Sequence, residues 1–291
     1  MSIKIVHYTI NNINFPKELS GYRIALFSDT HEQDFGDNFE KILKPLNKIN
    51  PDIVLFAGDA VNKPRYNLDT RSGYENSISL FERLARDYKI YYINGNHDLR
   101  LKALCEGGDL FADCYMDKKV EHYEKLREGV SDTTYEEFVN ALKSSGVHIL
   151  SNSRELICDG GIAITGLEIP LKYYRHKSEE LSVGDIRELI GEPVSGCYNI
   201  LLAHSPQFFE SYASWGADLT LCGHIHGGAF RLPIVGGILS PYRTFFPKYD
   251  YGHYSLDGRD MIVSSGAGDQ FLRGRITNPT EIVDITFTHK E

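Results

Sequence analysis

The 291-residue sequence has no apolar run approaching the roughly 18 residues that a membrane-spanning helix needs. Its five cysteines are odd in number and form no CxxC pair, which favours a reducing compartment over a disulfide framework. Residues 1–14 alternate polar and apolar side chains and lack the apolar centre of a signal peptide. These absences predict a cytoplasmic protein without a transmembrane segment, and they leave peripheral contact with a membrane open.

Positive charge is also scarce, since 31 Lys and Arg residues face 40 Asp and Glu residues and the formal net charge is −9. A general nucleic-acid-binding protein needs a basic surface, so we expect no nucleic-acid-binding footprint. The acidic residues and the 11 histidines are instead available to bind cations. The simpler interpretation is a solvated acidic surface.

The sequence does contain short apolar runs typical of buried strands, and they alternate with helical patterns in the first hundred residues. The predicted strands are 23–27, 53–57 and 90–93, and the predicted helices are 39–49 and 75–86. Strands that alternate with helices indicate an α/β protein with a covered sheet. Pro45 lies inside the first helical pattern and predicts a kink or a break there.

The rest of the chain returns to β-strand patterns after a region of different character. Residues 99–146 predict a helical insertion beside the site, and the alternative is plain surface packing. The remaining predicted strands are 3–10 at a sheet edge, the hairpin 155–165, and 199–203, 219–222, 261–264 and 282–287. A helix is expected at 208–215, with its Trp in the core, and residues 230–254 form a long loop rich in proline and aromatic residues.

The most informative stretch follows the apolar run Leu219–Cys222, where His224 and His226 stand between glycines. In an extended segment, residues i and i+2 point to the same side, so both imidazoles can face one site. Histidine is the commonest metal ligand near neutral pH. Taken alone, the pair fits ordinary strand-end histidines equally well. The flanking glycines are expected to clear space for a phosphate group.

Polar side chains of the same kind follow the other apolar strands. They are Asp29, His31, Asp59, Asn96, His97, Asp98 and His204. In α/β proteins, ligand sites lie at the carboxyl ends of the strands. Imidazoles, carboxylates and an amide without a thiolate suit Mn, Fe or Zn in a catalytic site. Seven or eight ligands exceed the needs of one cation, so the sequence predicts two divalent metal ions.

The order and spacing of these motifs resemble the calcineurin-like metallophosphoesterase superfamily. The motifs are Asp29-x-His31, Gly58-Asp59-x-x-Asn62, Gly95-Asn96-His97-Asp98, His204, and Gly223-His224-x-His226. The resemblance implies an α/β fold: a four-layer sandwich of two mixed β-sheets flanked by helices. We expect a single domain over residues 1–291, with 99–146 as the helical insertion.

The resemblance also implies roles for the matching residues. The first metal would be held by Asp29, His31 and His226, and the second by Asn96, His204 and His224, with Asp59 bridging them. His97 would stand near the leaving-group oxygen as a general acid or charge stabiliser, oriented by Asp98. A metal-bridging hydroxide would attack phosphorus in line.

Two positions depart from the family pattern. Asn62 stands where Asp is frequent, and we expect it not to bind a metal. Ile225 stands where Thr is common, and we expect its side chain to point away from the metals. The C-terminal pattern, which includes Gly266-x-Gly268 and Arg275, is similar to a bacterial subgroup containing hydrolases of UDP-2,3-diacylglucosamine type. Arg275 is therefore the predicted substrate-binding residue.

Other candidates have simpler explanations. Gly266-Ala267-Gly268 lacks the third glycine of a dinucleotide fingerprint, so a loop is expected. Arginines other than Arg275 could bind phosphate oxygens, with surface charge as the alternative for each: Arg100, Arg175, Arg243 and Arg273.

The sequence thus predicts a dinuclear metal-dependent phosphoesterase. Its substrate would be a small-molecule or lipid-linked phosphate: a phosphodiester or pyrophosphate first, a phosphomonoester second. The alternative is a non-catalytic scaffold or binding protein that keeps the fold and has lost its metals.

Overall fold

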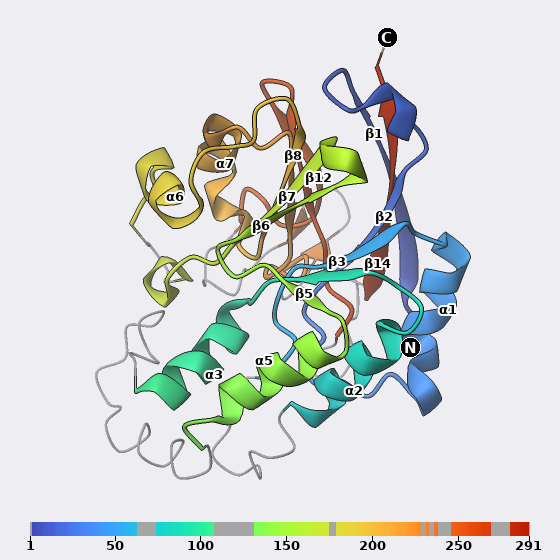
Figure 1. Cartoon of the computed structure of the whole chain (residues 1–291), viewed down its shortest axis with the longest axis vertical. Coiled ribbons are helices and arrows are strands. Elements are labelled where there is room, and N and C mark those ends of the chain that lie inside the picture. The colour runs from blue at the N-terminus through green and yellow to red at the C-terminus, as the bar shows by residue number, and fades with distance from the viewer. Residues whose placement is uncertain are drawn as a thin grey trace.

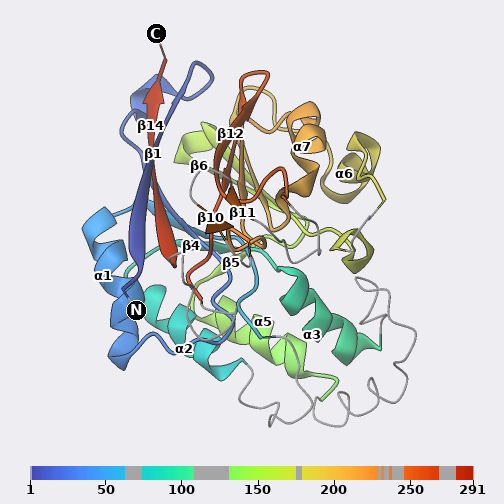
Figure 2. The same cartoon turned by 180° about the vertical axis from the view of Figure 1, so that it is seen from behind.

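The computed structural model describes residues 2–62, 74–107, 131–174, 179–228, 231–232, 236–237, 246–268 and 280–290. The described strands form two six-stranded sheets and a small ribbon of β10 (Arg231–Leu232) and β11 (Gly236–Gly237), labelled in Figure 2. Within these residues, every helix is too short or too polar to cross a bilayer.

Sheet A has the strand order β1-β14-β2-β3-β4-β5. Its strands are β1 (Lys4–Asn12), β14 (Glu281–His289), β2 (Arg23–Phe27), β3 (Ile53–Phe56), β4 (Ile90–Tyr92) and β5 (His148–Ile149). Strands β2 to β5 are parallel, whereas β14 runs antiparallel to β2 and parallel to β1. The first strand therefore lies at the edge, as predicted, beside the last (Figure 1).

Sheet B has the order β12-β13-β9-β8-β7-β6. Its strands are β12 (Gly252–Leu256), β13 (Arg259–Val263), β9 (Leu219–Cys222), β8 (Tyr198–Ala203), β7 (Ile162–Leu167) and β6 (Arg154–Ile157). The four central strands are parallel and the two edge strands are antiparallel to their neighbours. Both sheets are mixed, and the predicted hairpin is the β6–β7 pair.

The central strands read as continuous apolar runs because both of their faces are buried. In β2, Ile24 and Leu26 point into the cluster between the two sheets, whereas Ala25 and Phe27 point into the cluster beneath the helices. Strand β8 does the same on its side, with Ile200 facing the other sheet and Leu201 facing helices. Alternation along a strand therefore builds three core layers.

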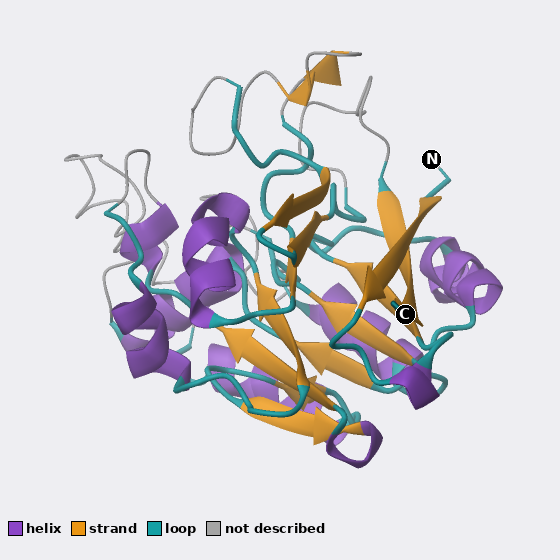
Figure 3. Cartoon of the chain, turned by 90° about the horizontal axis from the view of Figure 1, so that it is seen from above, coloured by secondary structure: helices purple, strands orange, loops and turns teal. Residues whose placement is uncertain are grey.

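Helices cover the outer face of each sheet. The helices against sheet A are α1 (Glu40–Ile49), α2 (Glu75–Leu84) and α5 (Thr134–Ser144), and those against sheet B are α6 (Val183–Ile190) and α7 (Phe209–Trp215). Figure 3 shows the two sheets in the middle with helices outside them. The predicted four-layer α/β sandwich is confirmed. Trp215 lies in the core, as expected, 2% exposed.

Three expectations need correction. Pro45 neither kinks α1 into two helices nor ends it. The missing hydrogen bond and ring clash cost about 3 kcal/mol, but four buried apolar side chains of α1, each worth about 1.5–3 kcal/mol, hold the helix on the sheet. Strands β10 and β11 and the first three residues of β12 lie inside the stretch predicted as a loop. The first helix of the expected insertion, α3 (Asn96–Glu106), begins at a candidate ligand and packs into the cores on both sides.

Candidate metal centre

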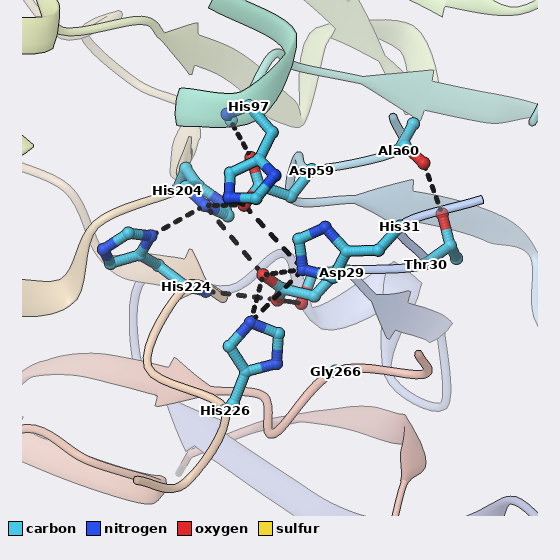
Figure 4. Close-up of polar contacts among 12 residues, drawn as sticks. Asp29, Thr30, His31, Asp59, Ala60, His97, His204, His224, His226 and Gly266 are labelled. Atoms are coloured by element: carbon cyan, nitrogen blue, oxygen red, sulfur yellow. Dashed lines mark hydrogen bonds and ion pairs between the residues drawn. The ribbon is translucent and has the colours of Figure 1, made fainter. Parts of the chain in front are cut away.

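The candidate ligands follow the carboxyl ends of five parallel strands. Sheet A places Asp29 and His31 after β2, Asp59 after β3 and Asn96 after β4, where α3 begins. Sheet B places His204 after β8, and both His224 and His226 after β9. Because the parallel strands of the two packed sheets end on the same side, the carboxylates and imidazoles converge (Figure 4).

One cluster contains Asp29, His31 and His226. The Oδ1 atom of Asp29 lies 3.7 Å from Nε2 of His31 and 3.4 Å from Nε2 of His226. The two imidazole Nε2 atoms are 3.3 Å apart. All three side chains are almost fully buried. The structure therefore brings together the three residues predicted to hold the first metal.

A second cluster contains Asp59, His204 and His224. The Nε2 atom of His204 lies 3.3 Å from Oδ2 of Asp59 and 3.1 Å from Nδ1 of His224. Asn96, the fourth residue of the predicted second half-site, is 4% exposed at the start of α3.

Asp59 lies between the two clusters. Its Oδ2 atom is 3.3 Å from His204 on one side and 4.0 Å from His31 on the other. A third cluster joins Asp59 and His31 to His97. A carboxylate can bind two cations at once, which an imidazole nitrogen cannot, so Asp59 stands where a bridging ligand would be needed.

The backbone orients the imidazoles. Nδ1 of His204 lies 2.6 Å from the carbonyl oxygen of Ala57, and Nδ1 of His31 lies 3.4 Å from that of Val61. A carbonyl oxygen accepts only, so Nδ1 carries a proton, and Nε2 of the neutral ring presents its lone pair to the cluster. Metal-binding histidines are commonly held in this way.

The backbone itself is strained at the site. Positive φ values occur at Asp29 (55°), His31 (48°), Asp59 (60°), His224 (69°) and His226 (55°). The left-handed region costs a residue with a Cβ atom roughly 1–2 kcal/mol. Five candidate ligands in this conformation indicate a local arrangement that the surrounding fold enforces, which is a common property of functional sites.

The buried charges interact strongly. Burial raises the pKa of Asp29 to about 6. Burial also opposes ionisation of Asp59, but the neighbouring imidazoles, His204 first, hold its pKa well below the usual range. Burial lowers the pKa of His204 as well, yet Asp59 and then Asp29 outweigh it and raise the value to about 9. Without a cation, the protonated His204 balances negative charge of the buried carboxylates.

Two buried oxygen atoms indicate which kind of ligand the site can bind. Oδ1 of Asp29 and Oδ1 of Asn96 are buried and have no hydrogen-bond partner among the described residues. Leaving a buried acceptor without a partner costs about 1–3 kcal/mol or more. Oxygen and nitrogen donors without a thiolate fit divalent Mn, Fe or Zn. The residues present therefore fit a divalent metal ion.

His97 lies beside His31 and Asp59, and its side chain is 12% exposed. Its Nε2 atom is 3.9 Å from Oδ2 of Asp59, its ring centroid is 4.8 Å from that of His31, and its backbone N–H donates to Oδ1 of Asp59 at 2.8 Å. Burial lowers the pKa of His97 well below its usual range. The ring is therefore neutral at pH 7 and can donate one N–H hydrogen bond.

Asp98 does not orient His97, contrary to the sequence-based expectation. Its carboxylate accepts hydrogen bonds from the backbone N–H groups of Asp59, Ala60, Val61 and Gly95. Nδ1 of His97 has no hydrogen-bond partner in the described part of the chain. The carboxylate binds backbone because Asp98, at the third position of α3, faces the N–H groups of the adjacent loop.

The glycine beside His224 also has a different role from the one expected. A Cβ atom on Gly223 would lie 2.4 Å from Oγ of Ser28 and 2.6 Å from Oδ2 of Asp29. The same Oδ2 accepts from the backbone N–H of His224 at 3.1 Å. Gly223 therefore clears space for Asp29 of the opposite sheet, and not for phosphate.

Two supporting residues were not predicted. The ring of Tyr174 packs edge-on against His224, with centroids 5.2 Å apart. The carboxylate of Glu32, next to His31, accepts from the N–H groups of Asn76 and Ser77 in the first turn of α2. In the sequence, Tyr174 follows Tyr173 directly, and nothing links either residue to His224. No sequence pattern links Glu32 to the backbone N–H groups at the start of α2.

The remaining predictions fall in different places. Arg275 lies outside the described residues. Arg100 lies on α3 one turn beyond Asn96 and His97. Ile225 is 2% exposed and packs in the core between sheet B and its helices, so its side chain points away from the clusters, as expected.

Comparison with known proteins agrees with this geometry. The sequence profile of the calcineurin-like phosphoesterases matches residues 22–228, which contain every ligand of both clusters. The chain belongs to this family. The resemblance seen in the motifs is thus confirmed at the level of the family, and the chain carries a metallophosphoesterase domain.

Relatives of this chain include two bacterial proteins and one fish protein. The chain is 26% identical to the uncharacterized metallophosphoesterase YkuE of Bacillus subtilis, over 98% of this chain and 85% of that protein. It is 26% identical to a transmembrane protein with metallophosphoesterase domain of Danio rerio, and spans 56% of that protein's length. Phosphodiesterase YaeI of Escherichia coli is 33% identical over 72 residues, which cover 25% of this chain and 26% of that protein.

Among solved structures, the sulfate thiohydrolase SoxB of Thermus thermophilus matches 92% of this chain and 57% of its own. The TM-score is 0.41 and the sequence identity is 13%.

Proposed function

We propose that this protein hydrolyses phosphate esters at a centre of two divalent cations. The observation that carries the proposal is the position of Asp59, whose Oδ2 atom is 3.3 Å from His204 and 4.0 Å from His31. One anionic group between two sets of ligands is what a pair of cations about 3.5–4 Å apart requires.

In the proposed centre, Asp29, His31 and His226 hold the first cation, and Asn96, His204 and His224 hold the second. The cations, when bound, would neutralise phosphate charge and lower the pKa of a nearby water molecule. Mn, Fe and Zn are all compatible with these ligands.

His97 serves the leaving group. Its ring lies beside Asp59 and His31 at the exposed side of the centre, where the departing oxygen of an ester would emerge. Because the pKa of His97 is lowered by burial, the neutral ring donates an N–H hydrogen bond to the developing negative charge. Of the two roles expected from the sequence, this supports charge stabilisation.

Arg100 is a described candidate to bind a phosphate oxygen. Residues 96, 97 and 100 lie on one face of α3, one turn apart. Burial lowers the pKa values of His97 and His224, and the positive charge of Arg100 acts in the same direction on both. Arg100→Ala should raise KM about tenfold, with partial recovery in Arg100→Lys.

The preferred substrate is a phosphodiester or pyrophosphate with a lipid or nucleotide part, followed by a phosphomonoester. The Escherichia coli relative is named a phosphodiesterase, which favours the diester. We infer a cytoplasmic location with peripheral membrane contact for a lipid-linked substrate, which fractionation of cells would test.

The test is hydrolysis of aryl phosphomonoesters and phosphodiesters by purified protein with Mn²⁺, Fe²⁺ or Zn²⁺. Turnover with at least one cation is expected. Metal analysis that shows two bound cations together with no turnover of any ester would contradict a hydrolase. No bound cation and no turnover would support the non-catalytic scaffold. A single bound cation at full activity would contradict the dinuclear centre.

A further inference from the structure

The carboxylate of Asp98 joins two loops that carry different parts of the metal centre. It is fully buried and lies on α3, directly after Asn96 and His97. Oδ2 accepts from the N–H groups of Asp59 and Gly95, each at 2.8 Å. Oδ1 accepts from those of Ala60 and Val61, at 3.1 and 3.0 Å. One side chain therefore satisfies three successive N–H groups of the Asp59 loop and one at the start of its own helix.

The connection is reciprocal. While Asp98 accepts from the backbone of Asp59, the carboxylate of Asp59 accepts from the backbone N–H of His97 at 2.8 Å. The second oxygen of Asp59 remains directed at the imidazoles of His204 and His31. Any movement of the Asp59 loop relative to α3 would break bonds in both directions.

Glycines allow the two loops to approach this closely. A Cβ atom on Gly58 would lie 2.5 Å from the backbone N of Gly95, and one on Gly95 would lie 2.2 Å from Oδ1 of Asp59. Gly58 has a φ of 92° and Asp59 one of 60°, so the loop adopts a conformation that needs external support. Asp98 supplies that support through hydrogen bonds to the N–H groups of the strained turn.

We propose that Asp98 is a positioning residue, which sets the placement of the bridging carboxylate of Asp59 relative to Asn96 and His97 and thereby the affinity of the centre for cations. The hydrogen bonds of Asp98 go to four backbone N–H groups, and Nδ1 of His97 does not bind its carboxylate. The inference rests on the proposed function only for its catalytic consequence, because its primary effect is on cation binding.

The decisive experiment compares the Mn²⁺ affinity of wild type, Asp98→Asn and Asp284→Asn. Mn²⁺ is titrated into each metal-free protein, and the electron paramagnetic resonance signal of free Mn²⁺ is measured. Asp284 is the matched control, because its carboxylate is similarly buried, at 1% exposure, but binds the side chains of Arg23, the first residue of β2, and His7 in β1. Asp98→Asn should weaken Mn²⁺ binding by about 10- to 100-fold. Asp284→Asn should lower the melting temperature and leave Mn²⁺ affinity within about twofold of wild type.

The opposite pattern would overturn the inference. If Asp98→Asn lowers only the melting temperature, as Asp284→Asn does, and binds Mn²⁺ like wild type, Asp98 serves stability alone. Asn introduces N–H donors opposite four N–H groups, so a second variant, Asp98→Ser, removes the carboxylate without them. Wild-type Mn²⁺ affinity in Asp98→Ser would likewise contradict the proposal. A wild type that binds Mn²⁺ but hydrolyses no ester would contradict the proposed function and leave this comparison intact.

Discussion

Sheet A and sheet B end at the same edge, but they carry different chemistry to it. Sheet A supplies both carboxylates of the clusters, Asp29 and Asp59, together with the imidazoles of His31 and His97 and the amide of Asn96. Sheet B supplies imidazoles alone, from His204, His224 and His226. Sheet A therefore supplies the negative charge of the centre, and sheet B supplies His204, the imidazole whose protonated form that negative charge stabilises.

The largest effect is expected from sheet A, where Asp59 would serve both cations. Asp59→Asn should lower kcat/KM by roughly 10³-fold or more and reduce the metal content of the purified protein, because a neutral amide is a poor bridge between cations. Activity assays and elemental analysis measure both. Two retained metals and a rate within about tenfold of wild type would show that Asp59 is not the bridge.

The next largest effect comes from a sheet A histidine that holds no cation in the proposed centre. His97→Ala should lower kcat by about 10²–10⁴-fold with both metals retained, since it removes only the donor to the leaving group. Elemental analysis is the control. Loss of a metal in this variant would make His97 a ligand and change the division of labour between the sheets.

A smaller effect should appear when pH titrates sheet B in metal-free protein. Burial lowers the pKa of His204, but Asp59 and Asp29 raise it overall, from its usual 6.5 to about 9. A group whose pKa is raised on folding stabilises the folded state fully below its unfolded pKa, and loses this contribution as pH rises through the folded value. The melting temperature of metal-free protein should therefore fall by several degrees between pH 6.5 and 9.

Burial raises the pKa of Asp98 and that of Glu32 to about 7 each, which acts in the same direction. With Mn²⁺ bound, His204 is deprotonated by coordination and its part of the fall should disappear. Melting curves with a chelator and with Mn²⁺ over this pH range measure the difference. A melting temperature that rises with pH in the chelator would refute the prediction.

The smallest effect is expected at Ile225, which lies between two sheet B ligands but points into the core. Ile225→Val should lower the free energy of unfolding by about 0.5–1.5 kcal/mol and leave kcat/KM unchanged. Chemical denaturation together with a standard assay suffices. A change in kcat/KM would mean that core packing at Ile225 affects the positions of the neighbouring imidazoles.

The sequence predicts which side chains come together where they follow buried strands. The apolar run Leu219–Cys222 and the spacing of His224 and His226 predict two imidazoles at one strand end, and the structure has both in the clusters. The fold was predictable for a similar reason, since strands buried on both faces read as unbroken apolar runs. Strand β12 has no such run, because its one fully buried residue is Gly252 and the others are exposed or half-buried.

What the sequence could not predict lies mostly in the backbone. The partners of Asp98 are N–H groups, which every residue has and which no motif distinguishes. Gly223 makes room for a side chain of the other sheet, and that contact joins residues nearly 200 positions apart. The left-handed torsions at five ligands likewise belong to tertiary structure and not to local preference, because Asp and His only tolerate this region.

Because of those left-handed torsions, the positions of the candidate ligands depend on the packing of the core. The conformation is held by the surrounding packing, so a variant that loosens the core should relax the ligand loops before the sheets separate. Bound cations would oppose this relaxation, since a ligand that binds only the folded state stabilises it by mass action. Metal retention under mild heating would then report weakened packing earlier than the loss of secondary structure does.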